Sequence, residues 1–500
     1  MNTQRPPHEP PRDGGRRDHR RGNPPDQDRR GGQDQRPRRD GSQRPFQKGG
    51  PAPKTGVGPD RPGGRDRPKP TARGLAQRAI YLILDRQMPL ETTLTGADDW
   101  MKLAPRDRAF TRLMVATVLR RLGQIDDILG QLVQKMPDGR DAYVRQILRI
   151  AAAQLLFLET PPHAAIDEAV KMTRGAGLKA MVNAVLRKIA SQKHALLSAQ
   201  DSERLNLPDW LWKRWCDAYG EENTRAISRA HTYEPPLDIT LRDPATAGVW
   251  AERLSGRALP NGSVRIGKPK PVPMLTGFAH GVWWVQDAAA TFPARLLGDV
   301  EGKTVIDLAA APGGKTLQLA AAGAQVTALD QSRERLERLF ENLERMKLSA
   351  DTDVADARYY KPKSPVDAVL LDTPCSATGT ARRHPDVVWN KTPEAIASLT
   401  QIQDALLKNA AGMVKPGGTL VYACCSLQPE EGIKRIEAFL RRHKDWRREP
   451  VRAAEVPGGE AFITAEGDMR TLPCNWMAAG GIDGFYIARL VKAAQSGDVG

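Results

Sequence analysis

The sequence predicts an α/β domain built on a parallel sheet, preceded by an all-α domain, and three observations lead to this fold class. Apolar residues recur at helical spacing from about residue 73 to residue 195. From about residue 286, short apolar runs alternate with amphipathic helices, as in sheets with crossover helices. Aspartates and glycines follow several of these runs, where parallel sheets bind their ligands.

The first 72 residues form a basic leader for which we expect no folded structure. Residues 1–70 contain 18 Lys and Arg against 9 Asp and Glu, within a chain of net charge +16. A segment this rich in Arg, Pro, Gly, Gln and Asp cannot bury enough apolar surface to fold. Two interpretations stay open: a solubilising disordered segment, or a non-specific tether for RNA or DNA.

We expect a cytoplasmic protein with reduced cysteines. The opening MNTQRPPHEP lacks the apolar segment of a secretory signal, and the longest apolar stretch, IAAAQLLFL, is too short to span a membrane. No CxxC pair occurs among Cys216, Cys375, Cys424, Cys425 and Cys474. Neither a disulfide framework nor a metal site is therefore predicted, and the thiols are free to do chemistry.

Residues 73–195 are expected to form the all-α domain. Four segments carry the helical pattern: ARGLAQRAIYLILDRQM, RDRAFTRLMVATVLRRLGQIDDILGQLV, AYVRQILRIAAAQLLFLE and AAIDEAVKMTRGAGLKAMVNAVLRKIAS. Residues 196–285 are assigned to an intermediate subdomain that links the two larger ones. Its tryptophans at 210, 212 and 215 are interpreted as helix packing rather than as a base-stacking platform.

Residues 286–493 are expected to form the α/β domain, and residues 494–500 a disordered tail. Strands are predicted at KTVIDL, AQVTALD, a short run before Asp356, PVDAVLLD, TLVYACCS and GFYIARLVK. Helices are predicted from Gly314 and over SRERLERLFENLERMK, PEAIASLTQIQDALLKNAAGMV and PEEGIKRIEAFLRRH. This alternation predicts a parallel sheet covered by helices on both faces.

The stretch DLAAAPGGKT, from Asp307 to Thr316, turns the chain out of the first of these strands. It ends like an ATPase phosphate loop, but Ala309 stands where that signature requires its first glycine. No G-x-G-x-x-G motif follows the strand, so NAD is disfavoured as well. Pro312, Gly313 and Gly314 nevertheless allow a ligand to approach the backbone closely.

Four strand ends in succession carry an aspartate: Asp307, Asp330, Asp356 and Asp372. Carboxylates would repel a triphosphate, whereas they suit S-adenosylmethionine, which has ribose hydroxyls, an amino group and a sulfonium but no phosphate. Asp330 follows Asp307 by 23 positions, a distance that suits bonding to a ribose hydroxyl pair. The set, together with the glycine turn, predicts S-adenosylmethionine as cofactor.

Two cysteine motifs follow neighbouring strands. Cys375 lies in LLDTPCSATGT, and Cys424 and Cys425 lie in LVYACCSL, so Cys375 and one of that pair are expected to meet above the sheet. Thiols beside a cofactor turn suggest covalent catalysis. A thiolate that adds to carbon-6 of cytosine makes carbon-5 reactive toward a sulfonium methyl group. Cys216 and Cys474 are instead interpreted as small buried hydrophobes.

These motifs resemble the Sun/RsmB family of RNA cytosine-5 methyltransferases. DLAAAPGGKT looks like the family's cofactor loop, LDTPCSATGT like its Pro-Cys motif, and YACCSLQPEEG like its second cysteine motif. VQDAAA and TLPCNWMAAGGIDGFYIARL are similar to flanking family features, and the helical region resembles the family's NusB-like RNA-binding domain. The resemblance covers about residues 73–492.

The resemblance implies a Rossmann-like S-adenosylmethionine-dependent methyltransferase domain that acts on RNA, with 16S ribosomal RNA as the expected substrate and a monomer as the expected state. Asp330 would bind the cofactor's ribose, and Asp356 would lie near its adenine. Asp372 would hold the target cytosine or the cofactor's amino group. Cys425 is implied as the nucleophile, and Cys375 as the residue that assists release of the product. The cofactor would be lined by Ala309, Ala310, Ala311, Pro312, Gly313, Gly314 and Lys315.

The chain departs from the family pattern at three positions. Cys424 replaces a usual threonine, Ala309 stands where many members have cysteine, and Gly432 stands where asparagine is frequent. The motifs leave two alternative functions, both less favoured. A DNA cytosine-5 methyltransferase is disfavoured by the second cysteine motif, and a non-catalytic NusB-like RNA-binding or antitermination factor by the full set of cysteines and aspartates.

Overall fold

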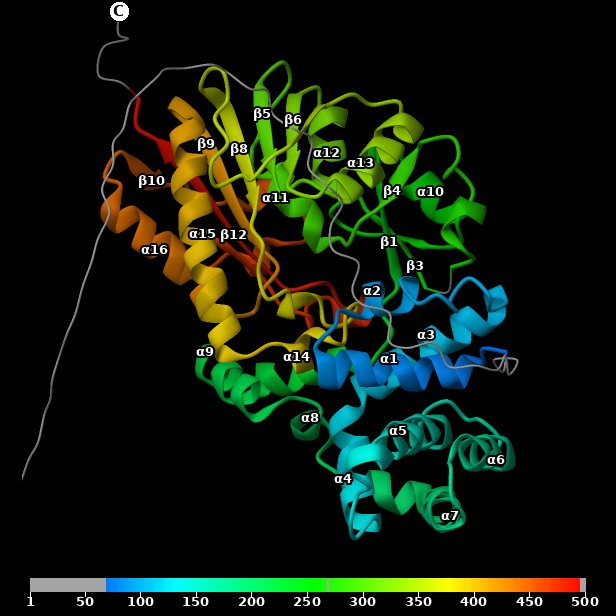
Figure 1. Cartoon of the computed structure of the whole chain (residues 1–500). Coiled ribbons are helices and arrows are strands. Elements are labelled where there is room, and N and C mark those ends of the chain that lie inside the picture. Colours follow the sequence, from blue (N-terminus) through cyan, green and yellow to red (C-terminus); the bar gives the residue numbers. More distant parts are fainter. Residues whose placement is uncertain (1–68, 268, 495–500) are drawn as a thin grey trace, which may run out of the picture. The chain divides into compact units, whose positions relative to one another are not determined.

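The helical pattern of the N-terminal region is realised as seven α-helices. The computed structural model describes residues 69–267 and 269–494 (Figure 1), so residues 1–68 of the basic leader and residues 495–500 of the predicted tail lie outside the described residues. The helices are α1 (Ala72–Arg86), α2 (Leu90–Thr95), α3 (Pro105–Arg120), α4 (Leu122–Leu132), α5 (Tyr143–Leu156), α6 (Pro162–Met172) and α7 (Ala176–Ser198).

Helix α5 is the core helix of this region because its sequence is apolar on nearly every side. All of its residues except Tyr143 and Arg145 are buried, and α1, α3, α4, α6 and α7 contact it. Its one buried charge, Arg149, lies 2.6 Å from Asp126 of α4. Two predicted segments are each divided into two helices. The second division falls at Gly175, whose φ of 82° a helix cannot include.

The intermediate region contains three α-helices and a small antiparallel sheet. Helices α8 (Ser202–Leu205) and α9 (Asp209–His231) come first, and α10 (Ala247–Arg253) packs on the sheet. The sheet has the order β2-β3-β1-β4, with β1 (Leu237–Leu241), β2 (Arg257–Ala258), β3 (Val264–Ile266) and β4 (Trp283–Val285). The sequence predicts no strand here, because strands of two to five residues are too short to show a period of two.

The three tryptophans of α9 pack, as predicted. Trp215 is fully buried, and Trp210 and Trp212 are half-buried against the same apolar cluster. The guanidinium groups of Arg204 and Arg225 lie over the Trp212 ring, at 5.1 and 5.2 Å from its centroid. The Trp212 ring is therefore engaged by cations within the protein.

The α/β domain contains an eight-stranded sheet of order β10-β12-β9-β8-β5-β6-β7, with β11 paired to β12. Strands β5, β6, β7, β8 and β9 are mutually parallel, as predicted. The strands are β5 (Thr304–Leu308), β6 (Gln325–Asp330), β7 (Asp351–Val354), β8 (Val366–Asp372), β9 (Val414–Cys424), β10 (Trp446–Arg448), β11 (Met469–Thr471) and β12 (Phe485–Lys492).

The prediction of a wholly parallel sheet is wrong for its last strands. The run GFYIARLVK forms β12, which is antiparallel to β9, β10 and β11. After α16 (Ile433–Arg442), β10 and β11 carry the chain back to the carboxyl edge of the sheet. From that edge the next strand can only run in the reverse direction.

Helices cover the two faces of the sheet unequally. Helices α11 (Phe292–Arg295), α12 (Gly314–Ala321) and α13 (Arg333–Met346) pack on one face, and α15 (Pro393–Met413) and α16 on the other. Residues 355–365, between β7 and β8, form a loop instead of a covering helix. The prediction of helices on both faces is therefore right for only part of the sheet.

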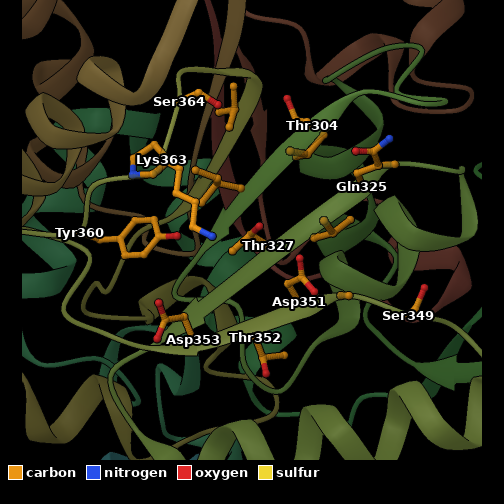
Figure 2. Close-up of a pocket in the computed structure, with 17 residues that line it drawn as sticks. Thr304, Gln325, Thr327, Ser349, Asp351, Thr352, Asp353, Tyr360, Lys363 and Ser364 are labelled. Atoms are coloured by element: carbon orange, nitrogen blue, oxygen red, sulfur yellow. The ribbon is translucent and has the colours of Figure 1, made fainter.

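The uncovered part forms a hollow of about 680 Å³ at the amino ends of β5, β6 and β7 (Figure 2). Its side chains suit contact with water rather than with a helix. They include Thr304, Gln325, Thr327, Asp351 and Asp353. Polar residues at alternate positions of β6 and β7 thus explain why this face needs no apolar cover.

The segment after Cys375 contacts the helical region. Helix α14 (Val387–Asn390) carries Trp389, whose indole N–H donates to the Leu119 carbonyl at 2.8 Å. The Leu90 N–H donates to Asp386 Oδ2 at 3.1 Å, and Arg120 Nη2 donates to the Arg382 carbonyl at 2.9 Å. One segment of the α/β domain is therefore held by α2 and α3.

Candidate active site

The first site element is the turn between β5 and α12. Ala309 has φ 59° and Gly313 has φ 106°, so the chain passes twice through the left-handed region. The positive φ favours glycine at position 313, and a Cβ there would also lie 2.3 Å from Leu339 Cδ1, so that the leucine would have to move. The Ala310 N–H donates to the Leu329 carbonyl at 2.8 Å. Residues 309–315 are thereby fixed at the carboxyl edge of β5 and β6.

Two buried aspartates flank this turn. Asp307 accepts the Thr316 hydroxyl at 2.7 Å through Oδ2, and its Oδ1 has no hydrogen-bond partner among the described residues. Burial raises the pKa of Asp307 to about 7. Asp330 accepts the Ser332 N–H at 2.9 Å, and Arg335 lies 3.2 Å from its second oxygen. Each carboxyl group thus has capacity left for a ligand hydroxyl or amine.

The other two aspartates each contact a cation. Asp372 lies 2.6 Å from Lys315 Nζ, and both side chains are largely buried. Burial lowers the pKa of Lys315, but Asp372 and Asp307 outweigh burial, so that the ammonium form is favoured. Asp356 is bonded by Arg358 of its own loop at 2.6 Å. Asp372 therefore lies beside the glycine turn, whereas Asp356 bonds within its own loop. That loop begins near Asp330, because the Ala355 N–H donates to the Asp330 carbonyl at 3.2 Å.

The topology brings two of the cysteines together. The Sγ atoms of Cys375 and Cys425 are 3.4 Å apart, at the ends of the adjacent strands β8 and β9. Cys424 is fully buried in the core under α15 and α16. Cys216 and Cys474 are half-buried away from this pair, and Cys474 packs in the cluster around α9. The expectation that Cys375 meets one cysteine of the second motif is therefore confirmed. That cysteine is Cys425, which is half-buried, whereas Cys424 is buried.

Both thiols are held in the protonated form. Contact with Cys375 and burial raise the pKa of Cys425 well above its ordinary value, while Lys315 acts in the opposite direction. Contact with Cys424 and burial raise the pKa of Cys375, while Cys425 lowers it. Lys315 is thus the charge that favours a thiolate at position 425.

A buried cluster of charges supports the segment after Cys375. Arg383 lies 2.5 Å from Asp287 Oδ2, and Arg382 lies 3.2 Å from Asp483 Oδ1. Burial opposes ionisation of Asp287, but Arg383 and Arg382 outweigh it and lower its pKa. Asp238 and Arg265, 2.7 Å apart, extend this arginine–aspartate cluster to strands β1 and β3.

Comparison with known proteins decides the family. The chain is 34% identical over 439 residues to ribosomal RNA small subunit methyltransferase B of Cronobacter sakazakii, a match that covers 84% of this chain and 98% of that protein. This chain belongs to the 16S rRNA methyltransferase RsmB/F family. The model of that family matches residues 294–491, and the NusB family model matches residues 70–191.

A second relative agrees with this RsmB/F assignment, and a solved structure shares the fold. The protein of the same description from Salmonella typhi is 34% identical over 438 residues, covering 84% of this chain and 98% of its own length. The crystal structure of PH0851 has a TM-score of 0.63 and 24% identity, and covers 84% of this chain and 99% of that one. The predicted fold class, a NusB-like all-α domain before a Rossmann-like methyltransferase domain, is confirmed.

Some features of this RsmB/F site were not predicted from the sequence. The arginine–aspartate cluster is one, and the carboxyl group of Glu431, which bonds both cysteine loops, is another. The hollow of Figure 2 contains none of the predicted site residues, because it lies at the opposite ends of the strands. Among the residues that the structure describes, no cluster of His, Cys, Asp and Glu could hold a metal ion, and no helix could cross a membrane.

Proposed function

We propose that this protein transfers a methyl group from S-adenosylmethionine to carbon-5 of a cytosine in 16S ribosomal RNA, through a covalent bond between Cys425 and carbon-6. The observation that carries the proposal is the pair of thiols 3.4 Å apart beside the Lys315–Asp372 ion pair and the glycine turn. Membership of the RsmB/F family supports ribosomal RNA methylation. The target atom and the covalent route rest on the chemistry of the thiols.

The residues around the turn fit S-adenosylmethionine. The free Oδ1 of buried Asp307 is a suitable acceptor for an amino group, and Asp330 has an oxygen without a hydrogen bond for a ribose hydroxyl. Residues 309–315 would lie along the methionine end, and Asp356 near the adenine. When bound, S-adenosylmethionine supplies an activated methyl group on a sulfonium.

In the proposed reaction, the Cys425 thiol, protonated at rest, first loses its proton to a base, and the Lys315 ammonium favours the resulting thiolate. Its sulfur bonds to carbon-6 of cytosine, and the displaced electron pair makes carbon-5 a nucleophile that takes the methyl group. A base then removes the carbon-5 proton, and the electron pair restores the ring double bond as the carbon–sulfur bond breaks. Cys375, whose Sγ lies 3.4 Å from that of Cys425, would assist this release. Asp372 would hold the cytosine.

Attack on carbon-6 requires access to the face of the base. We therefore expect the target cytosine to leave its stack or to lie in a loop before it meets the thiols. The NusB-like helices would bind neighbouring RNA. A fully paired duplex that is methylated as fast as a hairpin loop would contradict this part of the proposal.

The decisive experiment compares three variants, each with one cysteine replaced by alanine, on 16S ribosomal RNA with labelled S-adenosylmethionine. Cys425→Ala is expected to be inactive and to form no protein–RNA adduct, because the nucleophile is missing. Cys375→Ala is expected to form the adduct and to retain it, because release is impaired. Cys216→Ala, outside the site, is the matched control and should behave as the unaltered protein does.

Exchanged phenotypes of the first two variants would show that the nucleophile is Cys375, as in DNA cytosine-5 methyltransferases. Absence of any methyl transfer by the unaltered protein, with RNA binding retained, would favour the binding factor instead. Retained activity in Cys425→Ala would exclude the covalent route through that thiol.

A further inference from the structure

Each cysteine of the close pair is followed by a serine, and the two serines meet beneath the thiols. Ser376 and Ser426 are fully buried, with hydroxyl oxygens 2.9 Å apart. Both hydroxyls also lie 2.5 Å from one oxygen, Oε2 of Glu431. One carboxyl group therefore bonds to both cysteine loops at equivalent positions.

Hydrogen bonds from several residues fix Glu431 in this position. It is fully buried, and among the described residues no lysine or arginine pairs with it. Its Oε1 accepts the Ser376 N–H at 2.9 Å and Gln403 Nε2 at 3.0 Å. Its carbonyl accepts the Tyr422 hydroxyl at 2.6 Å, which fixes the backbone. A fully buried glutamate without a cation is rare, and its neighbours must compensate for the water that it loses.

Further bonds join the same two loops directly. The Gly379 N–H donates to the Cys425 carbonyl at 2.9 Å, and the Leu427 N–H donates to Thr378 Oγ1 at 3.0 Å. These bonds lie beyond the last paired residues of β8 and β9, so the sheet itself does not set the spacing of the thiols. The spacing depends on the polar groups between the loops, and Glu431 makes three bonds to them.

We propose that Glu431 is a positioning residue that sets the separation of the Cys375 and Cys425 thiols through Ser376 and Ser426. The catalytic meaning of this role rests on the proposed function, but the geometric role does not. A misplacement of about 1 Å lowers enzymatic rates by about 100-fold. A carboxyl group that aligns two reacting sulfurs therefore contributes to turnover without touching the substrate.

The test uses Glu431→Gln in a full-length background in which Cys216, Cys424 and Cys474 are serine, so that only the two thiols of interest remain. Glu430→Gln is the matched control, because Glu430 belongs to the same turn but pairs with Arg214 at 3.2 Å. The first readout is the rate of disulfide formation with diamide, in which the two thiols give two hydrogen atoms to the azo group. It needs neither RNA nor cofactor.

We expect Glu431→Gln to slow disulfide formation by tenfold or more, on the order of the loss that misplaced groups cause, and Glu430→Gln to leave the rate within about twofold. In single-turnover methyl transfer, Glu431→Gln should lower the rate constant by about 100-fold with RNA affinity unchanged. An unaltered disulfide rate in Glu431→Gln would overturn the proposal, even if methyl transfer were lost.

A second variant covers the case in which Glu431→Gln does not fold. Ser376→Ala with Ser426→Ala removes both hydroxyl bonds and leaves the carboxyl group in place, and it should slow disulfide formation as well. An unchanged rate in this double variant overturns the proposal. If the parent protein forms the disulfide quickly but never methylates RNA, the proposed function fails while the positioning role stands.

Discussion

Replacing Asp287 by asparagine measures how strongly the arginine–aspartate cluster stabilises the fold. The Asp287 side chain is 5% exposed and lies 2.5 Å from Arg383 and 3.4 Å from Arg382. Asparagine keeps the shape and still accepts a backbone N–H, but it leaves two arginines with too little buried negative charge. Loss of one partner of a buried ion pair costs about 3–5 kcal/mol. That is a large part of the 5–15 kcal/mol or so by which a domain is stable.

Urea unfolding near neutral pH, followed by tryptophan fluorescence, gives the free energy of unfolding for this comparison. The matched control is Asp217→Asn, which removes the exposed pair with Lys213 at 3.1 Å. An exposed pair contributes less than about 1 kcal/mol, so the control should unfold at almost the same urea concentration as the unaltered protein. Equal shifts of the two variants would refute the argument that burial makes the cluster strong.

Two further predictions concern ionisation. Burial raises the pKa of Asp307 from 3.8 to about 7, so the stability that it contributes is complete below 3.8 and is lost as the pH rises through 7. Asp307→Asn should therefore raise the temperature of thermal unfolding, relative to the unaltered protein, by more at about pH 8 than at about pH 5. A difference between the two proteins that does not depend on pH would contradict this. Lys315→Met removes the charge that lowers the pKa of Cys425, so the pH–rate profile of methyl transfer should move to higher pH, with less thiolate at a fixed pH. Lys303→Met, an exposed change, should leave the profile in place.

Local sequence signals predicted the elements that bear the candidate site. The glycine turn follows β5, and Asp307 and Asp330 lie at strand ends because a strand and its following turn are encoded by adjacent residues. The approach of Cys375 and Cys425 followed from strand order, since ends of adjacent parallel strands lie at one edge. The roles assigned to these residues stay predictions.

Features that depend on distant partners could not be predicted in this way. Arg383 pairs with Asp287 across 96 positions, and Ser376 with Glu431 across 55. Nothing in the neighbouring sequence marks either contact. The reversed direction of β12 was missed for a related reason, because two short strands intervene and neither shows a recognisable period. The uncovered face could have been predicted from β6, where Gln325 and Thr327 alternate with apolar residues.

The bond from the Trp389 indole to the Leu119 carbonyl bears on any attempt to dissect the protein by truncation. A fragment that began at the α/β domain would lose the α3 carbonyl and the Leu90 amide that hold the segment around Asp386. It would also turn an aromatic ring of α14 toward solvent. Slow turnover by such a fragment would then reflect the loss of these structural contacts as much as the loss of RNA contacts. Surface substitutions on intact helices are the cleaner way to separate the two.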